Sequence, residues 1–209
     1  MPPSPMFPLG SVLVPGMILP LHVFEPRYRA LVRDCLAGDR EFGVVLIARG
    51  PEVGGGDVRT DVGTMARIVR ADQLPDGRFA VGAVGMRRIR VDAWLEDDPY
   101  PRAELSDWPD REAGGGEAGR AAELAGVVDR LLRRVAALRA ELGDPAPPLD
   151  LSLAGDPLVA SYQATAIAPL GPADRQDLLA APGAVARLEA LERLLGEQVE
   201  LLAARLGEG

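Results

Sequence analysis

Residues 7–48 read FPLGSVLVPGMILPLHVFEPRYRALVRDCLAGDREFGVVLIA and decide the fold. The order predicts two apolar strands joined at a Pro15-Gly16 turn, a helix entered through Glu25-Pro26, and a third apolar strand. The helix prediction rests on apolar residues spaced three and four apart, which places them on one helical face: Tyr28, Leu31, Val32, Cys35 and Leu36. This stretch therefore predicts a helix that packs on one side against strands.

Both ends of that helix carry sequence signals. Pro26 suits the first helical position because its missing N–H has no intrahelical acceptor there, and Gly38 is expected to take the left-handed conformation that ends a helix. The flanking runs, residues 17–24 and 42–48, are apolar on both faces. This pattern predicts strands that are covered on both sides or wound into a small barrel.

Composition predicts a soluble globular protein. The chain has 209 residues and is 47% hydrophobic, so it can bury a sizeable core as one large domain or two small ones. No apolar run approaches the roughly 20 residues needed to span a bilayer, and the N-terminus lacks the basic-then-apolar order of a signal peptide. We therefore expect a cytoplasmic protein with no membrane partner.

Missing residue types exclude most catalytic chemistry. All 23 basic residues are arginine, so a phosphate-binding P-loop, a Ser-Lys dyad and Schiff-base chemistry are excluded. His22 is the only histidine, so a multi-histidine metal site is impossible, and a Ser-His-Asp triad would have to be built on it. Cys35 is the only cysteine and lies on the apolar helix face, where we expect a buried thiol. We predict no enzyme, no cofactor and no metal site.

After the opening stretch the sequence predicts a loop and more strands. Residues 50–60 are expected to be a surface loop, and their three-glycine run lacks the following helix pattern that a phosphate cradle needs. Pro75-Asp76-Gly77 predicts a turn that joins a hairpin, because Pro fixes φ and Gly accepts positive φ. The predicted strands are residues 64–74, 78–86, 88–95 and 100–105. In residues 88–95 the alternation predicts one core face, with Arg88 on the mostly wet face.

The second half of the chain predicts helices. Composition shifts at residues 112–119 (EAGGGEAG), so we place a boundary between a β subdomain, residues 1–111, and a helical subdomain, residues 112–209. The first predicted helix covers residues 120–142 and stops at Gly143. The second starts at Pro157, with Asp156 as its N-cap, and ends before Pro169. The third covers residues 172–180, and the fourth runs from Pro182 to the end. A long coiled coil is the alternative, but the prolines of the connector at residues 144–150 favour a compact bundle of about four helices.

These residues together resemble the LON substrate-binding domain, the N-terminal domain of the ATP-dependent protease Lon, which also occurs alone in bacteria. The resemblance rests on the opening stretch and on several further segments, with no single motif carrying it: Gly63-Thr64-Met65-Ala66, Asp76-Gly77-Arg78, Asp156-Pro157, Ser161-Tyr162 and Arg175-Gln176-Asp177-Leu178-Leu179. It implies an α+β fold, with an N-terminal PUA-like small β-barrel, one helix inserted after the second strand, and a C-terminal α-helical bundle. It also implies substrate recognition without proteolysis, because the ATPase and peptidase domains are expected to be absent.

Three functional classes are compatible with this resemblance. The first is a non-catalytic module that binds unfolded or specific client protein segments, in concert with a protease or unfoldase. The second is RNA binding, which other PUA-like folds perform, with Arg87, Arg88 and Arg90 as a local basic cluster. Charge argues against nucleic acid, because residues 1–111 carry a net charge of −2 and residues 112–209 a net charge of −6. The third, a ligand pocket like that of cereblon, needs a zinc domain built on cysteines that this chain does not have. The oligomeric state is left open.

The predicted binding surface lies where the second strand meets the helix. An apolar strand end there adjoins a charged and aromatic helix start, so the junction offers a client both apolar and polar contacts. The candidate residues are Leu21, His22, Phe24, Glu25, Arg27 and Tyr28. The alternative is structural: Glu25 stabilises the helix N-terminus, Arg27 pairs with a neighbouring carboxylate and Tyr28 packs in the core.

Overall fold

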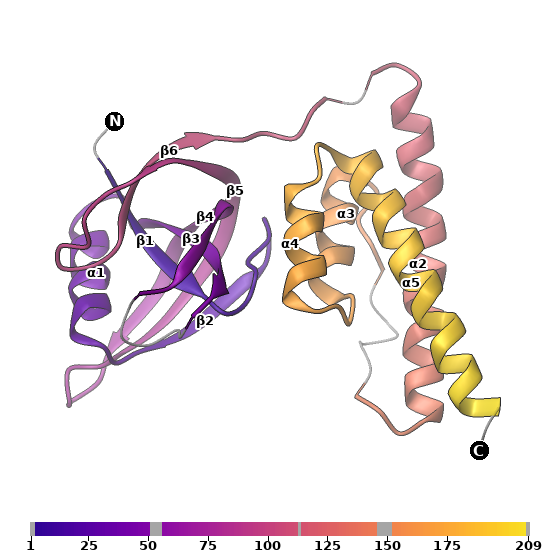
Figure 1. The fold of residues 1–209 in the computed structure, drawn as a ribbon, viewed down its shortest axis with the longest axis horizontal. Helices are drawn as coiled ribbons and strands as arrows, with labels where there is room; N and C mark the ends of the chain where they lie inside the picture. The colour runs from indigo at the N-terminus through magenta and orange to yellow at the C-terminus, as the bar shows by residue number, and fades with distance from the viewer. Residues whose placement is uncertain (1–2, 51–55, 113, 146–151, 208–209) are drawn as a thin grey trace. The chain divides into compact units, whose positions relative to one another are not determined.

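A computed structural model describes residues 3–50, 56–112, 114–145 and 152–207 (Figure 1). Its contacts divide the chain into two units, Met1–Pro109 and Asp110–Gly209. The first unit contains strands and one helix, and the described part of the second contains four helices. The predicted α+β class is therefore confirmed.

The first unit is a mixed sheet of six strands with helix α1, Pro26–Ala37, after the second strand. The strands are β1 Ser4–Leu9, β2 Ile18–Val23, β3 Glu41–Arg49, β4 Val58–Gln73, β5 Phe79–Trp94 and β6 Arg102–Asp107. The sheet order is β2-β5-β4-β3-β1-β6, and β5 also pairs with β6. Only the β1–β3 pair is parallel among the pairs of the described strands. The pairings from β1 through β3, β4, β5 and β6 thus return to β1.

Strand β5 is continuous where the sequence predicts two strands. No turn interrupts it. A bulge in β5 between Gly85 and Arg87, whose partners are adjacent in β4, absorbs the change in alternation. The first half of β5 pairs with β2 and the second half with β6. The bulge also turns Arg88 inward, so the prediction that Arg88 lies on a wet face is wrong. Its guanidinium lies 4.7 Å from the ring centroid of Trp108 and the residue is 3% exposed.

Two loop predictions also need correction. Residues 58–60, predicted as loop, already belong to β4, where Arg59 pairs with Ile47; residues 51–55 of that prediction lie outside the described residues. Gly38 has a φ of −111° and is not left-handed, because the chain reverses at Arg40, whose φ is 65°. The Arg40 N–H donates to the Cys35 carbonyl at 2.9 Å and completes that reversal.

The turn predictions at Pro15-Gly16 and Pro75-Gly77 are confirmed. Gly16 and Gly77 both have a φ of 82°, which a residue with a side chain rarely adopts. The core of the unit lies between α1 and the sheet, and Leu31 and Phe42 are fully withdrawn from solvent there. A second cluster packs among the paired strands: Met6, Val45, Met65, Ile89, Val91 and Ala103.

The second unit consists of α2 Glu117–Glu141, α3 Pro157–Ile167, α4 Pro172–Ala180 and α5 Ala184–Gly207. The Asp156 side chain accepts the Val159 N–H at 2.9 Å, as the predicted N-cap of α3. Gly143 follows α2 with a φ of 72°, which confirms the predicted stop. The leucine stripes of α2 and α5 share one core with residues of α3 and α4: Leu124, Val128, Leu132, Ala164, Leu178, Leu188, Leu191 and Leu195.

Candidate functional site

The six predicted site residues lie together at the end of β2 and the start of α1. Five of them border one pocket of about 190 Å³ with residues of β1 and β2: Leu21, His22, Phe24, Glu25 and Tyr28, beside Phe7, Pro8, Leu9, Pro20 and Val23. Arg27 does not border it. Phe24 beside this pocket is 54% exposed, although burial of a phenylalanine side chain would stabilise the fold. The junction thus offers a small apolar cavity next to an exposed aromatic ring.

Tyr28 and Arg27 hold the base of this junction. Tyr28 is buried, and its ring stacks on Phe7 with centroids 4.1 Å apart. Burial raises the pKa of its phenol to about 12, so the hydroxyl stays protonated at neutral pH. Arg27 donates from Nε to Glu25 Oε2 at 3.1 Å, and its guanidinium lies 4.5 Å from the Tyr28 ring centroid. Glu25 makes no side-chain cap to the helix. Tyr28 and Arg27 thus have the structural contacts that the alternative interpretation predicts.

A larger apolar surface continues from the pocket onto the sheet, and we call it the outer face. It is the side of β2, β5 and β4 opposite the core. Ile18 of β2 pairs directly with Val84 of β5 on this face and is 68% exposed. Val69 of β4 is 59% exposed, and a Cβ placed on Gly82 would lie 3.9 Å from it, so Val69 borders the same face.

The outer face decides between two expectations and adds candidate residues to the predicted site. The apolar pattern of residues 17–24 predicts a strand covered on both sides or wound into a small barrel, and within the described residues of the first unit nothing covers Ile18, so the first alternative is wrong. Exposed apolar side chains that lie next to one another mark interaction surfaces more often than single ones do. Sequence analysis missed Ile18, Val69 and Val84 as site residues. The signal was present, because the strand pattern places apolar residues on both faces.

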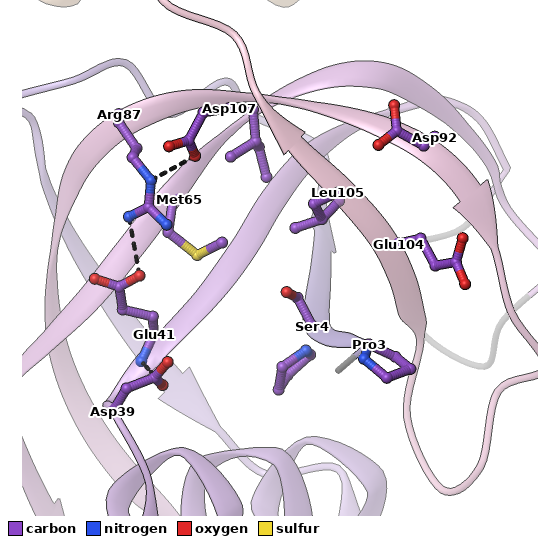
Figure 2. Close-up of a pocket in the computed structure, with 12 residues that line it drawn as sticks. Pro3, Ser4, Asp39, Glu41, Met65, Arg87, Asp92, Glu104, Leu105 and Asp107 are labelled. Atoms are coloured by element: carbon purple, nitrogen blue, oxygen red, sulfur yellow. Dashed lines mark hydrogen bonds and ion pairs between the residues drawn. The ribbon is translucent and has the colours of Figure 1, made fainter. Parts of the chain in front are cut away.

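A second and larger cavity of the first unit, about 500 Å³, lies elsewhere and is acidic (Figure 2). Its apolar lining includes Met65, Ile89 and Leu105. Its carboxylates are Asp39, Glu41, Asp92, Glu104 and Asp107. Arg87 donates to Glu41 at 2.9 Å and to Asp107 at 2.7 Å, so its charge is already compensated.

The geometry of this cavity bears on the nucleic-acid hypothesis. Of the three arginines that could form a basic cluster, Arg87 is paired with two carboxylates and Arg88 is buried against Trp108. Arg87 and Arg90 are exposed, and of these two Arg87 is the one held by carboxylates on both sides. The arginine triplet of β5 therefore presents no basic patch, and the adjoining carboxylates repel phosphate groups.

Metal sites and membrane spans are the next two kinds of feature. Among the described residues, no three His, Cys, Asp or Glu side chains come together as metal ligands would. Of the helices described, none combines the length and the apolar character needed to cross a membrane. Cys35 is buried, its thiol lies 3.3 Å from the Glu41 carbonyl, and burial raises its pKa to about 12.

Comparison with known proteins gives the family. The profile described as "ATP-dependent protease La (LON) substrate-binding domain" matches residues 4–197. The chain belongs to this family. Lon protease 2 of Sorangium cellulosum is 30% identical over 95% of this chain, and the Lon protease of Desulfosudis oleivorans is 27% identical over 98%. This LON-domain chain spans about a quarter of the length of each of these relatives.

Solved structures show the same fold. The crystal structure of a Lon N-terminal domain protein from Xanthomonas campestris is 30% identical, with a TM-score of 0.64, and the match covers 91% of this chain and 97% of that one. The N-terminal domain of a Mycobacterium avium complex Lon protease also has a TM-score of 0.64, with 20% identity over 95% of this chain. The second likeness concerns the fold alone.

Proposed function

We propose that this LON-domain chain is a non-catalytic module that binds unfolded or specific segments of client proteins at the outer face and the adjoining pocket. The observation that carries the proposal is the exposure of Ile18 and Val69 on the outer face, where Ile18 pairs with Val84, together with the exposed Phe24 at the other end of β2. Substrate binding is also what the description of the family states. A protease or unfoldase that acts on the client is the proposed partner, and the cytoplasm the proposed location.

The surface suits a polypeptide with large apolar side chains. The pocket of about 190 Å³ has room for one such side chain, and the outer face offers a flat apolar floor because Gly82 and Ala80 are small. His22, exposed at the edge, and Glu25 supply polar groups for the client backbone. RNA fits this surface less well, since phosphate groups need cations, and the two arginines of β4 that border it, Arg67 and Arg70, are each paired with a carboxylate.

Two architectural details belong to the same proposal. The circuit of strand pairings from β1 back to β1 supports a PUA-like small β-barrel. The shift in composition at residues 112–119 supports a functional boundary after residue 111, with the four helices of the second unit acting as a bundle. Neither detail is needed for client binding at the outer face.

The test is a binding measurement with fluorescein-labelled, reduced and unfolded α-lactalbumin. We expect Ile18→Ser and Phe24→Ala each to weaken binding by on the order of 1 kcal/mol or more, about fivefold in Kd. The melting temperature should barely move, because both side chains are more than half exposed. Arg27→Ala, at the start of α1 and outside the pocket lining, tests whether the junction itself takes part.

Leu201→Ser is the matched control, because Leu201 is 64% exposed on α5, far along the chain from the proposed surface. It should leave the Kd unchanged. Equal losses in Ile18→Ser and Leu201→Ser would show that any exposed apolar residue suffices, and the proposal would fail. A lower melting temperature with unchanged binding per folded molecule would assign Ile18 and Phe24 to stability alone. Binding of cellular RNA in place of α-lactalbumin would favour the second functional class.

A further inference from the structure

Strand β2 has one free edge. The sheet order places β2 at the end of the sheet, paired with β5 only, and in the described part of the chain no strand pairs with its other edge. The pocket and the exposed Phe24 adjoin this edge, since Pro20 through Phe24 line the cavity. A free edge carries backbone N–H and C=O groups without a strand partner, which is the template that another extended segment needs.

The hydrogen bonds of the sheet show which groups of β2 face outward. The Gly85 N–H donates to the Met17 carbonyl at 2.9 Å, so the Met17 carbonyl faces β5, while the Met17 N–H donates to the Val14 carbonyl in the preceding turn. In an antiparallel pair, every second residue directs its backbone N–H and C=O toward the neighbouring strand. Every second residue after Met17 therefore also bonds to β5: Leu19, Leu21 and Val23. The intervening residues direct their backbone groups to the free edge: Ile18, Pro20 and His22.

The presence of proline at position 20 independently supports the assignment of its backbone to the free edge. Its ring has no N–H, and within a sheet proline takes positions where no ladder bond requires that donor. Pro20 lies opposite Gly82 in the pairing with β5, which is intact on both sides of it. The free edge therefore presents the N–H groups of Ile18 and His22 and the carbonyls of Ile18, Pro20 and His22.

We propose that the client binds as an added strand, with its backbone hydrogen-bonded to Ile18, Pro20 and His22 and one large apolar side chain in the pocket. This inference rests on the proposed function and specifies the form of the client. The client is an extended segment that carries apolar residues, and the sequence between those residues can vary. Backbone bonding gives affinity without sequence preference, and the pocket adds a preference for an apolar side chain at alternate positions.

The edge itself favours a client over a second copy of the chain. In a symmetric pairing of two β2 strands centred on Pro20, each Pro20 would oppose the other, and each of the two carbonyls would face a ring nitrogen that has no N–H to donate. A client residue other than proline supplies an N–H to the Pro20 carbonyl. A helix cannot match this edge, because its own backbone groups are bonded internally.

The first experiment removes one backbone donor from the edge. His22→Pro deletes an N–H that faces away from β5, so β2 and β5 should stay paired. The measurement compares the binding of unfolded α-lactalbumin to His22→Pro with its binding to His22→Ala. We expect the proline variant to bind about tenfold more weakly than the alanine variant. Equal binding by two folded variants would overturn strand addition.

The second experiment leaves the protein unchanged and modifies the ligand. A short peptide of alternating leucine and serine is N-methylated either on all its leucines or on all its serines. Because an added strand uses only alternate backbone groups, one peptide should lose about tenfold in affinity and the other about twofold or less. Equal losses would overturn the proposal even if His22→Pro fails to fold.

The outcomes separate the two proposals. If the native chain binds neither α-lactalbumin nor the unmethylated peptide, the proposed function itself fails. If it binds both, loses affinity on Ile18→Ser, and shows equal effects of the two methylation patterns, only strand addition fails. A dimer in sedimentation that His22→Pro dissociates would assign the edge to a second copy and overturn the client assignment.

Discussion

Arg187 donates a hydrogen bond of 2.7 Å to the Asp110 carboxylate, which joins α5 to the first residue of the helical unit, 77 positions earlier in the sequence. The Arg187 side chain is fully buried. It also donates to the Leu178 carbonyl and to the Ser161 hydroxyl, each at 2.9 Å, and lies 4.0 Å from the Tyr162 ring centroid. The Tyr162 hydroxyl donates to the same Asp110 carboxylate. This cluster holds α3, α4 and α5 together with the start of the unit.

Arg187→Met should destabilise the helical unit by about 3–5 kcal/mol, because it leaves the Asp110 carboxylate withdrawn from water without its cation. Urea unfolding followed by circular dichroism at the helix band measures the loss. The control is Arg193→Met, which breaks an exposed pair with Glu197 on the same helix and should change stability by about 0.5 kcal/mol or less. Similar effects of the two substitutions would show that the buried cluster contributes little.

Gly85→Ala should destabilise the first unit by about 1–3 kcal/mol, since the added Cβ would lie 2.5 Å from the Val14 carbonyl oxygen. Gly196→Ala is the opposite case. Gly196 lies within α5 with nothing within 4 Å of an added Cβ, so alanine should stabilise the helix by about 0.5–1 kcal/mol. Thermal and urea unfolding of both variants measure the two changes. A neutral Gly85→Ala would mean that the Val14 loop moves away without cost.

The stability of the first unit should fall in alkali. Burial raises the pKa of Cys35 from 9.0 and that of Tyr28 from 10.0, each to about 12. The unfolded chain loses these protons first, so the stability from their neutral forms is complete below about pH 9 and is lost as the pH rises toward about 12. The measurement is the free energy of unfolding in urea at about pH 8 and about pH 10.5.

Cys35→Ala tests the origin of that pH dependence. The variant should lose some stability at all pH values because a buried side chain shrinks, but its decline above about pH 9 should be shallower than that of the native chain. Parallel declines in the two proteins would exclude the thiol as a contributor.

The sequence predicts local structure well where one residue type decides it. Pro26 begins α1 and Asp156 caps α3, and Gly16 and Gly77 turn the chain, because each has a conformational or hydrogen-bonding property that acts within a few residues. Gly38 shows the limit. It has the right chemistry for a left-handed stop, but the hydrogen bond from Arg40 to Cys35 moves the reversal two residues onward.

Five of the six candidate residues border one pocket, and their role in binding stays a prediction. Periodicity shows that Leu21 and Phe24 end an apolar strand, and it locates the junction with α1. It cannot show whether another element covers the second face of β2, so the exposure of Ile18 became visible only in the structure. Arg187 was missed for a related reason. Arginine in a helix is usually solvated, and its partner Asp110 is distant in sequence.

The pairing of β1 has a consequence for the protein as it leaves the ribosome. β1 precedes both of its partners in the sequence, since it pairs with β3 and, at Ser4 and Pro5, with β6. Synthesis at about 5–20 residues per second therefore leaves an apolar strand without its second neighbour for several seconds. The β4–β5 hairpin, whose contacts are local, can form during that interval. During that interval the unpaired β1 has the form that we propose for a client, an extended apolar segment.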